Sequence, residues 1–96
     1  MASNFRVLVH RNDDDVHLKL AGDVDGGSVK ELARALKRHR RGASRAFIHT
    51  NALGRMSPAA RDALKRRLET MHQEGLSLVV TGDLADELAP DVARRV

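Results

Sequence analysis

The chain has 96 residues, a formal net charge of +4 and no cysteine. This length suits one modest core, so the sequence predicts a single domain over residues 1–96. Disulfides, thiolate metal sites and thiol nucleophiles are excluded, and two phenylalanines are too few for a platform that stacks single-stranded nucleic acid. No apolar run reaches the roughly 20 residues of a membrane helix, and residues 1–4 lack the features of a signal peptide. A cytoplasmic location is therefore expected.

The first part of the chain predicts two antiparallel strands. Residues 5–10 are β-branched and alternating, and Val16, Leu18 and Leu20 alternate with more polar neighbours. Residues 12–15 are Asn and Asp, which favour a turn because their side chains bond to their own backbone. Since both strands alternate, one face of the sheet is expected to meet water while the other is buried.

A turn and then a helix are predicted after the second strand. Residues 22–27 break the strand pattern, and Ser28 is predicted to cap the helix with Glu31 as its capping-box partner. Basic residues suit the last turn of this helix, and Gly42 ends it. One apolar stripe at helical spacing is expected to face the core, and it comprises Val29, Leu32, Ala33 and Leu36.

A third strand and a second helix follow. Residues 46–50 predict the strand. Ser57 and Pro58 predict the helix start, because serine caps helices and proline suits the first helical position. Gly75 ends this helix, whose expected core side comprises Ala60, Ala63, Leu64, Leu68 and Met71.

The last part of the chain predicts a fourth strand at residues 76–81 and a short helix at residues 83–88 that stops near Pro90. The tail, residues 91–96, is expected to continue as helix or to fray. The predicted fold class is α/β, with the order β-β-α-β-α-β-α. Right-handed helical crossovers make the sheet mainly parallel with an antiparallel first strand, and the helices are expected mainly on one face.

Positive charge is concentrated in the middle of the chain. Residues 34–67 carry eleven Lys or Arg against one Asp, whereas residues 1–33 have a net charge of −2 and residues 68–96 of −4. Such a block is either a solvated helix face or a surface for nucleic acid, an anionic membrane or an acidic protein. No helix-turn-helix, zinc-finger or aromatic ribonucleoprotein motif accompanies it. The residues available to bind nucleic acid are Arg34, Lys37, Arg38, Arg41, Arg66 and Arg67.

Three features in order resemble those of a known family. Residues 22–25, Gly-Asp-Val-Asp, look like a Gly-Glu-Leu-Asp turn after a second strand. An irregular apolar stretch at residues 52–56 leads to the second helix, which runs to Gly75 and an apolar strand. Over residues 18–88 the chain thus resembles the STAS domain, the fold of bacterial anti-sigma-factor antagonists and of the cytoplasmic tails of sulphate transporters. The resemblance implies a regulatory, protein-binding function without catalysis.

The chain departs from the family at its switch. In STAS domains an Asp-Ser-Ser-Gly motif starts the second helix, and a partner kinase phosphorylates its first serine. Here Ser57 stands at the Asp position, Pro58 at the phosphoacceptor, Ala59 at the second serine and Ala60 at the glycine. Proline has no hydroxyl, so the usual switch is predicted to be absent. Ser57 is interpreted as a helix cap, with a shifted phosphorylation site as the alternative.

A second departure lies at the end of the third strand, where the family's usual Asp or Asn is replaced by His49.

The resemblance also indicates where a partner binds. In the family the turn after the second strand helps to contact the kinase, which suits exposed carboxylates at Asp23 and Asp25; a merely solvated turn is the alternative. The partner implied is an anti-sigma-type kinase, a transport ATPase or a signalling assembly. The predicted partner-binding residues are Asp23, Asp25, Arg55, Ser57, Pro58 and Ala59.

No catalytic, metal or cofactor site is predicted. His10, His17 and His49 fall on the outward side of their strands, but that alone does not bring metal ligands together. Gly26 and Gly27 precede a helix but lack the lysine of a nucleotide-binding loop. No nucleophile–base pair stands out, so an enzyme is not expected. The sequence favours a bacterial, cytoplasmic protein-interaction module of STAS type, with a nucleic-acid or anionic-surface binder as the alternative.

Overall fold

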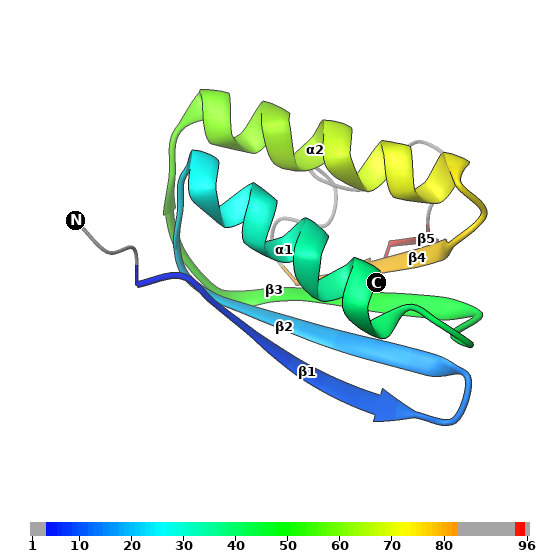
Figure 1. Cartoon of the computed structure of the whole chain (residues 1–96). Coiled ribbons are helices and arrows are strands. Elements are labelled where there is room, and N and C mark those ends of the chain that lie inside the picture. The colour runs from blue at the N-terminus through cyan, green and yellow to red at the C-terminus, as the bar shows by residue number, and fades with distance from the viewer. Residues whose placement is uncertain (1–3, 83–93, 96) are drawn as a thin grey trace.

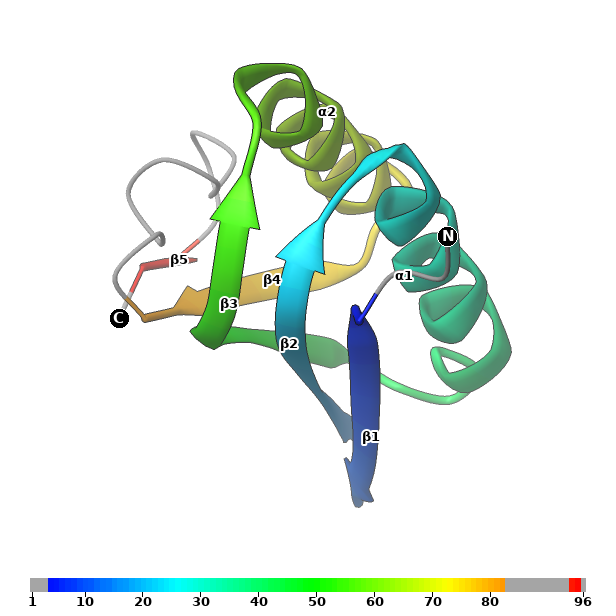
Figure 2. The same cartoon turned by 90° about the vertical axis from the view of Figure 1, so that its left-hand side faces the viewer.

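The computed structural model describes residues 4–82, 94 and 95, and it shows a five-stranded sheet with two helices packed on one face (Figure 1 and Figure 2). The strands lie in the sheet in chain order. Within the described residues, neither helix combines the length and the apolar character needed to cross a membrane. The elements are β1 (Arg6–Asn12), β2 (Asp15–Val24), α1 (Gly26–His39), β3 (Arg45–Met56), α2 (Pro58–Gln73), β4 (Ser77–Thr81) and β5 (Arg94–Arg95).

The topology agrees with the predicted fold class. β1 runs antiparallel to β2, and β2, β3, β4 and β5 are parallel neighbours. α1 and α2 connect the parallel strands across the same face, as predicted (Figure 2). The predicted helix at residues 83–88 lies outside the described residues. The tail prediction is wrong for residues 94 and 95, which pair with β4 as a short strand instead of forming a helix or fraying.

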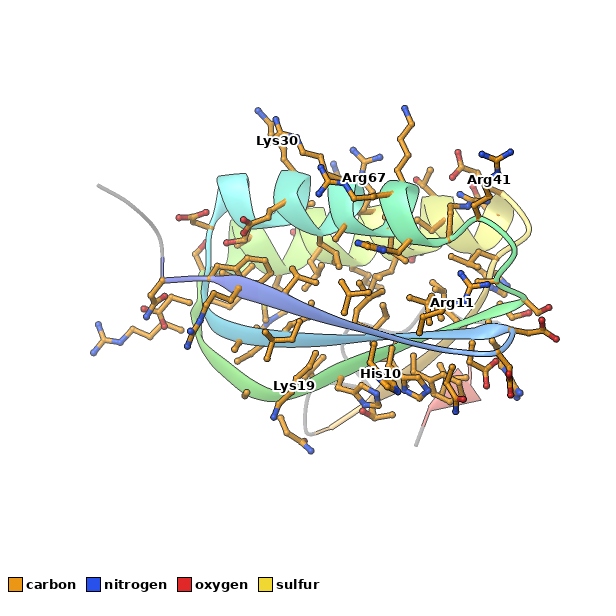
Figure 3. All side chains as sticks on the ribbon, turned by 60° about the horizontal axis from the view of Figure 1, so that its bottom comes forward. His10, Arg11, Lys19, Lys30, Arg41 and Arg67 are labelled. Atoms are coloured by element: carbon orange, nitrogen blue, oxygen red, sulfur yellow. The ribbon has the colours of Figure 1, made fainter. Side chains whose placement is uncertain are left out.

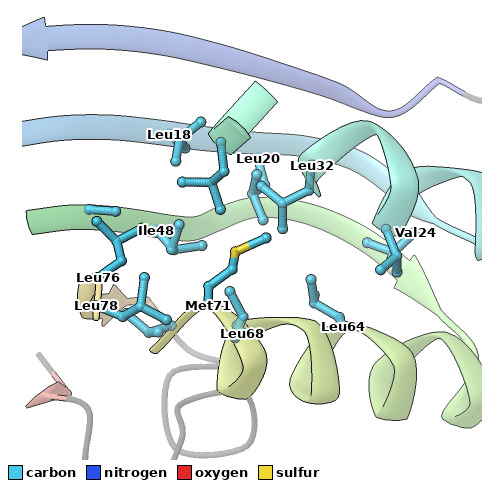
Figure 4. Packing of buried hydrophobic residues seen from close by; sticks show 14 of the residues in the cluster. Leu18, Leu20, Val24, Leu32, Ile48, Leu64, Leu68, Met71, Leu76 and Leu78 are labelled. Carbon is cyan, nitrogen blue, oxygen red and sulfur yellow. The ribbon is translucent and has the colours of Figure 1, made fainter. Parts of the chain in front are cut away.

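The core fills the space between the helices and the covered face of the sheet (Figure 4). Leu18, Leu20 and Ile48 point into it from the sheet and are fully buried. Burying one such side chain contributes about 1.5–3 kcal/mol. Both predicted helix stripes are confirmed, because every member is buried or half-buried: Val29, Leu32, Ala33 and Leu36 on α1, and Ala60, Ala63, Leu64, Leu68 and Met71 on α2.

β2 and β3 extend further than the sequence predicted. Their pairing continues to Val24 and Met56, past two register shifts. Gly22 lies within β2 at a φ of 92°, a left-handed conformation, and a Cβ there would collide with a neighbouring backbone carbonyl. The prediction that the strand breaks at residue 22 is therefore wrong, because β2 continues to Val24. Residues 52–56 also belong to β3 and do not follow it, but their pairing with β2 is irregular, as the register shifts show.

The N-cap of α1 is Asp25, not Ser28 as predicted. Asp25 Oδ1 accepts from the backbone N–H of Ser28 at 2.9 Å, and Ser28 Oγ accepts from the backbone N–H of Asp25 at 2.9 Å. These two bonds form the capping box that the sequence assigned to Ser28 and Glu31. An aspartate at this position satisfies a free amide and also favours the positive end of the helix dipole, so the helix begins three residues earlier.

Candidate functional site

Both helices begin at the same edge of the sheet. The last paired residues of β2 and β3 are Val24 and Met56, and the N-caps Asp25 and Ser57 follow directly. The carboxyl ends of these adjacent parallel strands lie at one edge of the sheet (Figure 2). All six predicted partner-binding residues lie here and are exposed. We call this set the contact edge: Asp23, Asp25, Arg55, Ser57, Pro58 and Ala59.

A hydrogen bond joins the two strands within the contact edge. The backbone N–H of Arg55 donates to Asp23 Oδ1 at 2.7 Å. The backbone N–H of Asp23 in turn donates to Asn4 Oδ1 at 2.8 Å. Gly54 makes room for the first bond, because a Cβ there would collide with the Asp23 carboxylate. The structure thus brings Asp23 and Arg55 together and gives Asp23 a structural role that the sequence did not reveal.

Asp25 is held by its role as a cap. The backbone N–H of Ser28, followed by the Ser28 hydroxyl, lowers the pKa of the Asp25 carboxyl below its ordinary value of 3.8. Asp25 is therefore ionised at neutral pH and unsuited to act as a general acid. The same Ser28 N–H is not free to bind a phosphate, which favours the helix-start interpretation of Gly26 and Gly27.

Ser57 caps α2, and Pro58 is its first residue, as the sequence predicted. Ser57 Oγ accepts from the backbone N–H of Ala60 at 3.1 Å. This bond satisfies one of the amides that a helix start leaves without an internal partner. Between residues 55 and 60, Ser57 carries the only hydroxyl in the sequence.

A second cluster, which the sequence analysis missed, lies on the sheet face opposite the helices, here called the open face. His17 Nδ1 and His49 Nε2 share a hydrogen bond at 3.1 Å, and His49 Nδ1 lies 2.7 Å from Thr81 Oγ1. The Phe47 ring stacks on His17 with 4.5 Å between centroids. His10 lies on the same face (Figure 3). Alternation along the strands predicted the shared face, but the contacts depend on the β2–β3 register.

The chemically reactive part of this cluster is the hydrogen-bonded pair of His17 and His49. Among residues 4–82, 94 and 95, no three histidine, aspartate or glutamate side chains are arranged to hold a metal ion. Burial first, and then the positive charges of His17 and Lys19, lower the pKa of His49 below 6.5. Protonation of both rings leaves no acceptor for the bond between them. The pair is therefore sensitive to acid.

Comparison with solved structures finds the same architecture in anti-sigma-factor antagonists. An antisigma-factor antagonist, a STAS domain from Rhodobacter sphaeroides, gives a TM-score of 0.68 at 16% identity, covering 93% of this chain and 95% of that one. The anti-sigma factor antagonist SpoIIAA, in its unphosphorylated form, gives a TM-score of 0.66 at 9% identity, covering 96% and 86%. The chain has the STAS fold.

A third solved structure is similar over most of this chain. The structure of Mglu gives a TM-score of 0.68 at 20% identity over 90% of this chain, which spans 20% of the Mglu chain. The sequence matches no family model, and no curated protein matches it. The similarity to the two solved anti-sigma-factor antagonists confirms, at the level of the fold, the resemblance to STAS domains seen in the sequence.

Ser57→Ala is expected to lower the free energy of unfolding by roughly 0.5–2 kcal/mol, because the Ala60 N–H loses its acceptor. Ser57→Asp is expected to be nearly neutral, since aspartate also caps and complements the helix dipole. Urea denaturation measures both effects. Ser44→Ala makes the same change at an exposed loop position and serves as the control. If Ser57→Ala is as stable as Ser44→Ala, the capping role is wrong.

The wild-type protein is expected to lose more stability than His49→Gln as the pH falls below 6.5. In the folded state the pKa of His49 is lowered, so the unfolded chain takes up the proton first, and acid favours unfolding. Urea midpoints measured over a series of pH values test this. The other histidines are common to wild type and His49→Gln, so the difference between the two proteins reports on His49. Identical pH dependence of wild type and His49→Gln would contradict the prediction.

Proposed function

We propose that the protein is a non-catalytic regulatory module that binds a partner protein through the contact edge. The observation that carries this proposal is that all six residues are exposed at one edge, with Asp23 and Arg55 joined by a hydrogen bond. The STAS structures that it resembles include two anti-sigma-factor antagonists, which supports a regulatory role. The partner classes implied are an anti-sigma-type kinase, a transport ATPase or a signalling assembly, all acting in the bacterial cytoplasm.

The contact edge is suited to binding more than to chemistry. Asp23 and Asp25 each accept a backbone N–H, from Arg55 and Ser28 respectively, so both carboxylates are fixed in place. Groups that are already ordered bind a partner at a lower entropic cost. Next to these carboxylates, Arg55 offers a cation and Ala59 a small apolar surface. The edge therefore presents both charges and a small apolar surface, the polar character found at the rim of protein interfaces.

We further propose that the usual phosphate switch does not operate in this protein. Pro58 occupies the first position of α2, where the resemblance places the phosphorylated serine, and it has no hydroxyl. The nearby Ser57 hydroxyl accepts from the backbone N–H of Ala60. Binding would then be constitutive or controlled by another route.

The two helices support a second candidate function, binding of nucleic acid or another anionic surface. α1 and α2 contact each other, and Lys30 and Arg67 project away from the sheet (Figure 3). Positive charge of this kind attracts polyanions without reading sequence. The predicted cationic residues are all exposed: Arg34, Lys37, Arg38, Arg41, Arg66 and Arg67.

Affinity capture from the native host with quantitative mass spectrometry tests the contact edge. Arg55→Glu reverses a charge there without removing the backbone N–H that bonds to Asp23. Lys19→Glu makes the same charge change on the open face. A discrete protein partner is expected with wild type and Lys19→Glu, reduced at least about tenfold with Arg55→Glu. Asp25→Arg is unsuitable, because it also removes the cap of α1.

The same capture distinguishes the second candidate through a variant that neutralises four cations of the helical surface, Arg38, Arg41, Arg66 and Arg67. This variant is expected mainly to slow association and to weaken its salt dependence. If it abolishes capture at every salt concentration while Arg55→Glu has no effect, the contact edge is wrong and the anionic-surface function is favoured.

Intact-mass analysis of the protein purified from its native host is expected to show no phosphate. The physical reason is that Pro58 cannot accept one and Ser57 serves as a cap. Stoichiometric phosphorylation at Ser57 would contradict this expectation and restore an ordinary switch. A phosphatase-treated sample of the same preparation provides the reference mass.

A further inference from the structure

A groove runs between the two helices on the side away from the sheet. It consists of two adjoining hollows, of about 410 Å³ near the start of α1 and about 290 Å³ near its end, which share Arg67. Apolar side chains form the floor: the half-buried Ala33 and Ala63, and below them Val29 and Met71, which are 7% and 5% exposed. Cationic side chains form the rim: Lys30, Lys37, Arg40, Arg66 and Arg67. We call this feature the interhelix groove.

The rim carries far more positive than negative charge. Glu74 is the carboxylate that lines the groove, and its Oε1 lies 3.3 Å from Arg40 Nη1. Among the described residues, no ion pair is found for Lys30, Lys37, Arg66 or Arg67. Like charges gathered around an apolar floor repel one another, and an acidic partner would relieve that repulsion.

We propose that the interhelix groove binds an acidic amphipathic helix of a partner protein. Apolar side chains on one stripe of this helix would cover the floor, and its carboxylates would pair with the cationic rim. The inference deepens the proposed function, on which it rests, because it names the kind of segment that the partner presents. The groove reaches Gly26, next to the cap Asp25, so a partner bound at the contact edge would extend into it.

The dimensions and the chemistry of the groove both favour a helix. α1 has 14 residues and is therefore about 21 Å long, which matches a partner helix of four turns. Ala33 of α1 and Ala63 of α2 are the half-buried members of the floor, and amphipathic helices dock in apolar grooves of this kind. The two alanines allow close approach. A nucleic-acid backbone is charged throughout and has no apolar stripe to cover this floor.

Fluorescence anisotropy with a designed peptide tests the proposal directly. The probe is a labelled helical peptide of about 18 residues with leucines at i, i+3, i+4 and i+7 and glutamates elsewhere. Wild type is expected to bind it, and Arg67→Glu is expected to weaken binding at least about tenfold. Lys19→Glu, the matched charge reversal on the open face, is expected to change binding less than about twofold. Circular dichroism confirms that both variants are folded.

Two further probes decide between the occupants. A peptide of the same composition with its leucines scattered keeps the charge and loses the stripe, so it is expected to bind at least about tenfold more weakly. Equal binding of both peptides would overturn the proposal, because the floor would then contribute nothing. Binding of random duplex DNA or of anionic phosphatidylglycerol vesicles, lost in Arg67→Glu, without binding of the designed peptide would overturn it in favour of a polyanion site.

Failure of the peptide experiment is distinguishable from failure of the proposed function. The peptide reports on Arg67 and the groove floor, whereas affinity capture reports on Arg55 at the contact edge. If capture of the partner depends on Arg55 but not on Arg67, and the designed peptide does not bind, the proposal for the interhelix groove is wrong. The proposal for the contact edge is then unaffected.

Discussion

The pairing of β2 with β3 as far as Val24 and Met56 determines where both helices begin. Parallel neighbours that end together start their next helices together, so Asp25 and Ser57 cap α1 and α2 at one edge. The bond from the Arg55 N–H to Asp23 closes the pairing at that edge. The register of β2 against β3 therefore determines which residues form the contact edge. The exposed side chains of the contact edge are attached to backbone that is already ordered.

The two faces of the sheet carry different kinds of side chain. Each helix buries one apolar stripe against the covered face, so its cations point to water and line the interhelix groove. On the open face, the register instead joins the rings of His17, Phe47 and His49. Since Arg67 and His49 lie on opposite sides of the sheet, anion attraction and acid sensitivity can be altered independently.

The sequence predicted those features that depend on local patterns. Alternating strands, helix stripes and the Ser57-Pro58 start are local, and they led to the correct order and direction of the first four strands. The cap of α1 was misplaced because Asp25 and Ser28 are both good capping residues, and only the backbone path decides between them. Long-range pairing was beyond a single sequence: the register shifts between β2 and β3, the bond between Asp23 and Arg55 and the contact of His17 with His49 all depend on which residues pair. Conversely, the exposed positions of the contact edge followed from the STAS resemblance and not from periodicity.

Amide hydrogen exchange of the protein, alone and in complex with its captured partner, shows whether the partner covers the contact edge. Binding is expected to slow exchange of the amides in residues 22–28 and 55–60, which form the contact edge and the first turns of α1 and α2. The amides of residues 17–19 and 47–49, behind the open face, are predicted to keep their rates. Slower exchange confined to residues 17–19 and 47–49 would contradict the account and place the partner on the histidine face.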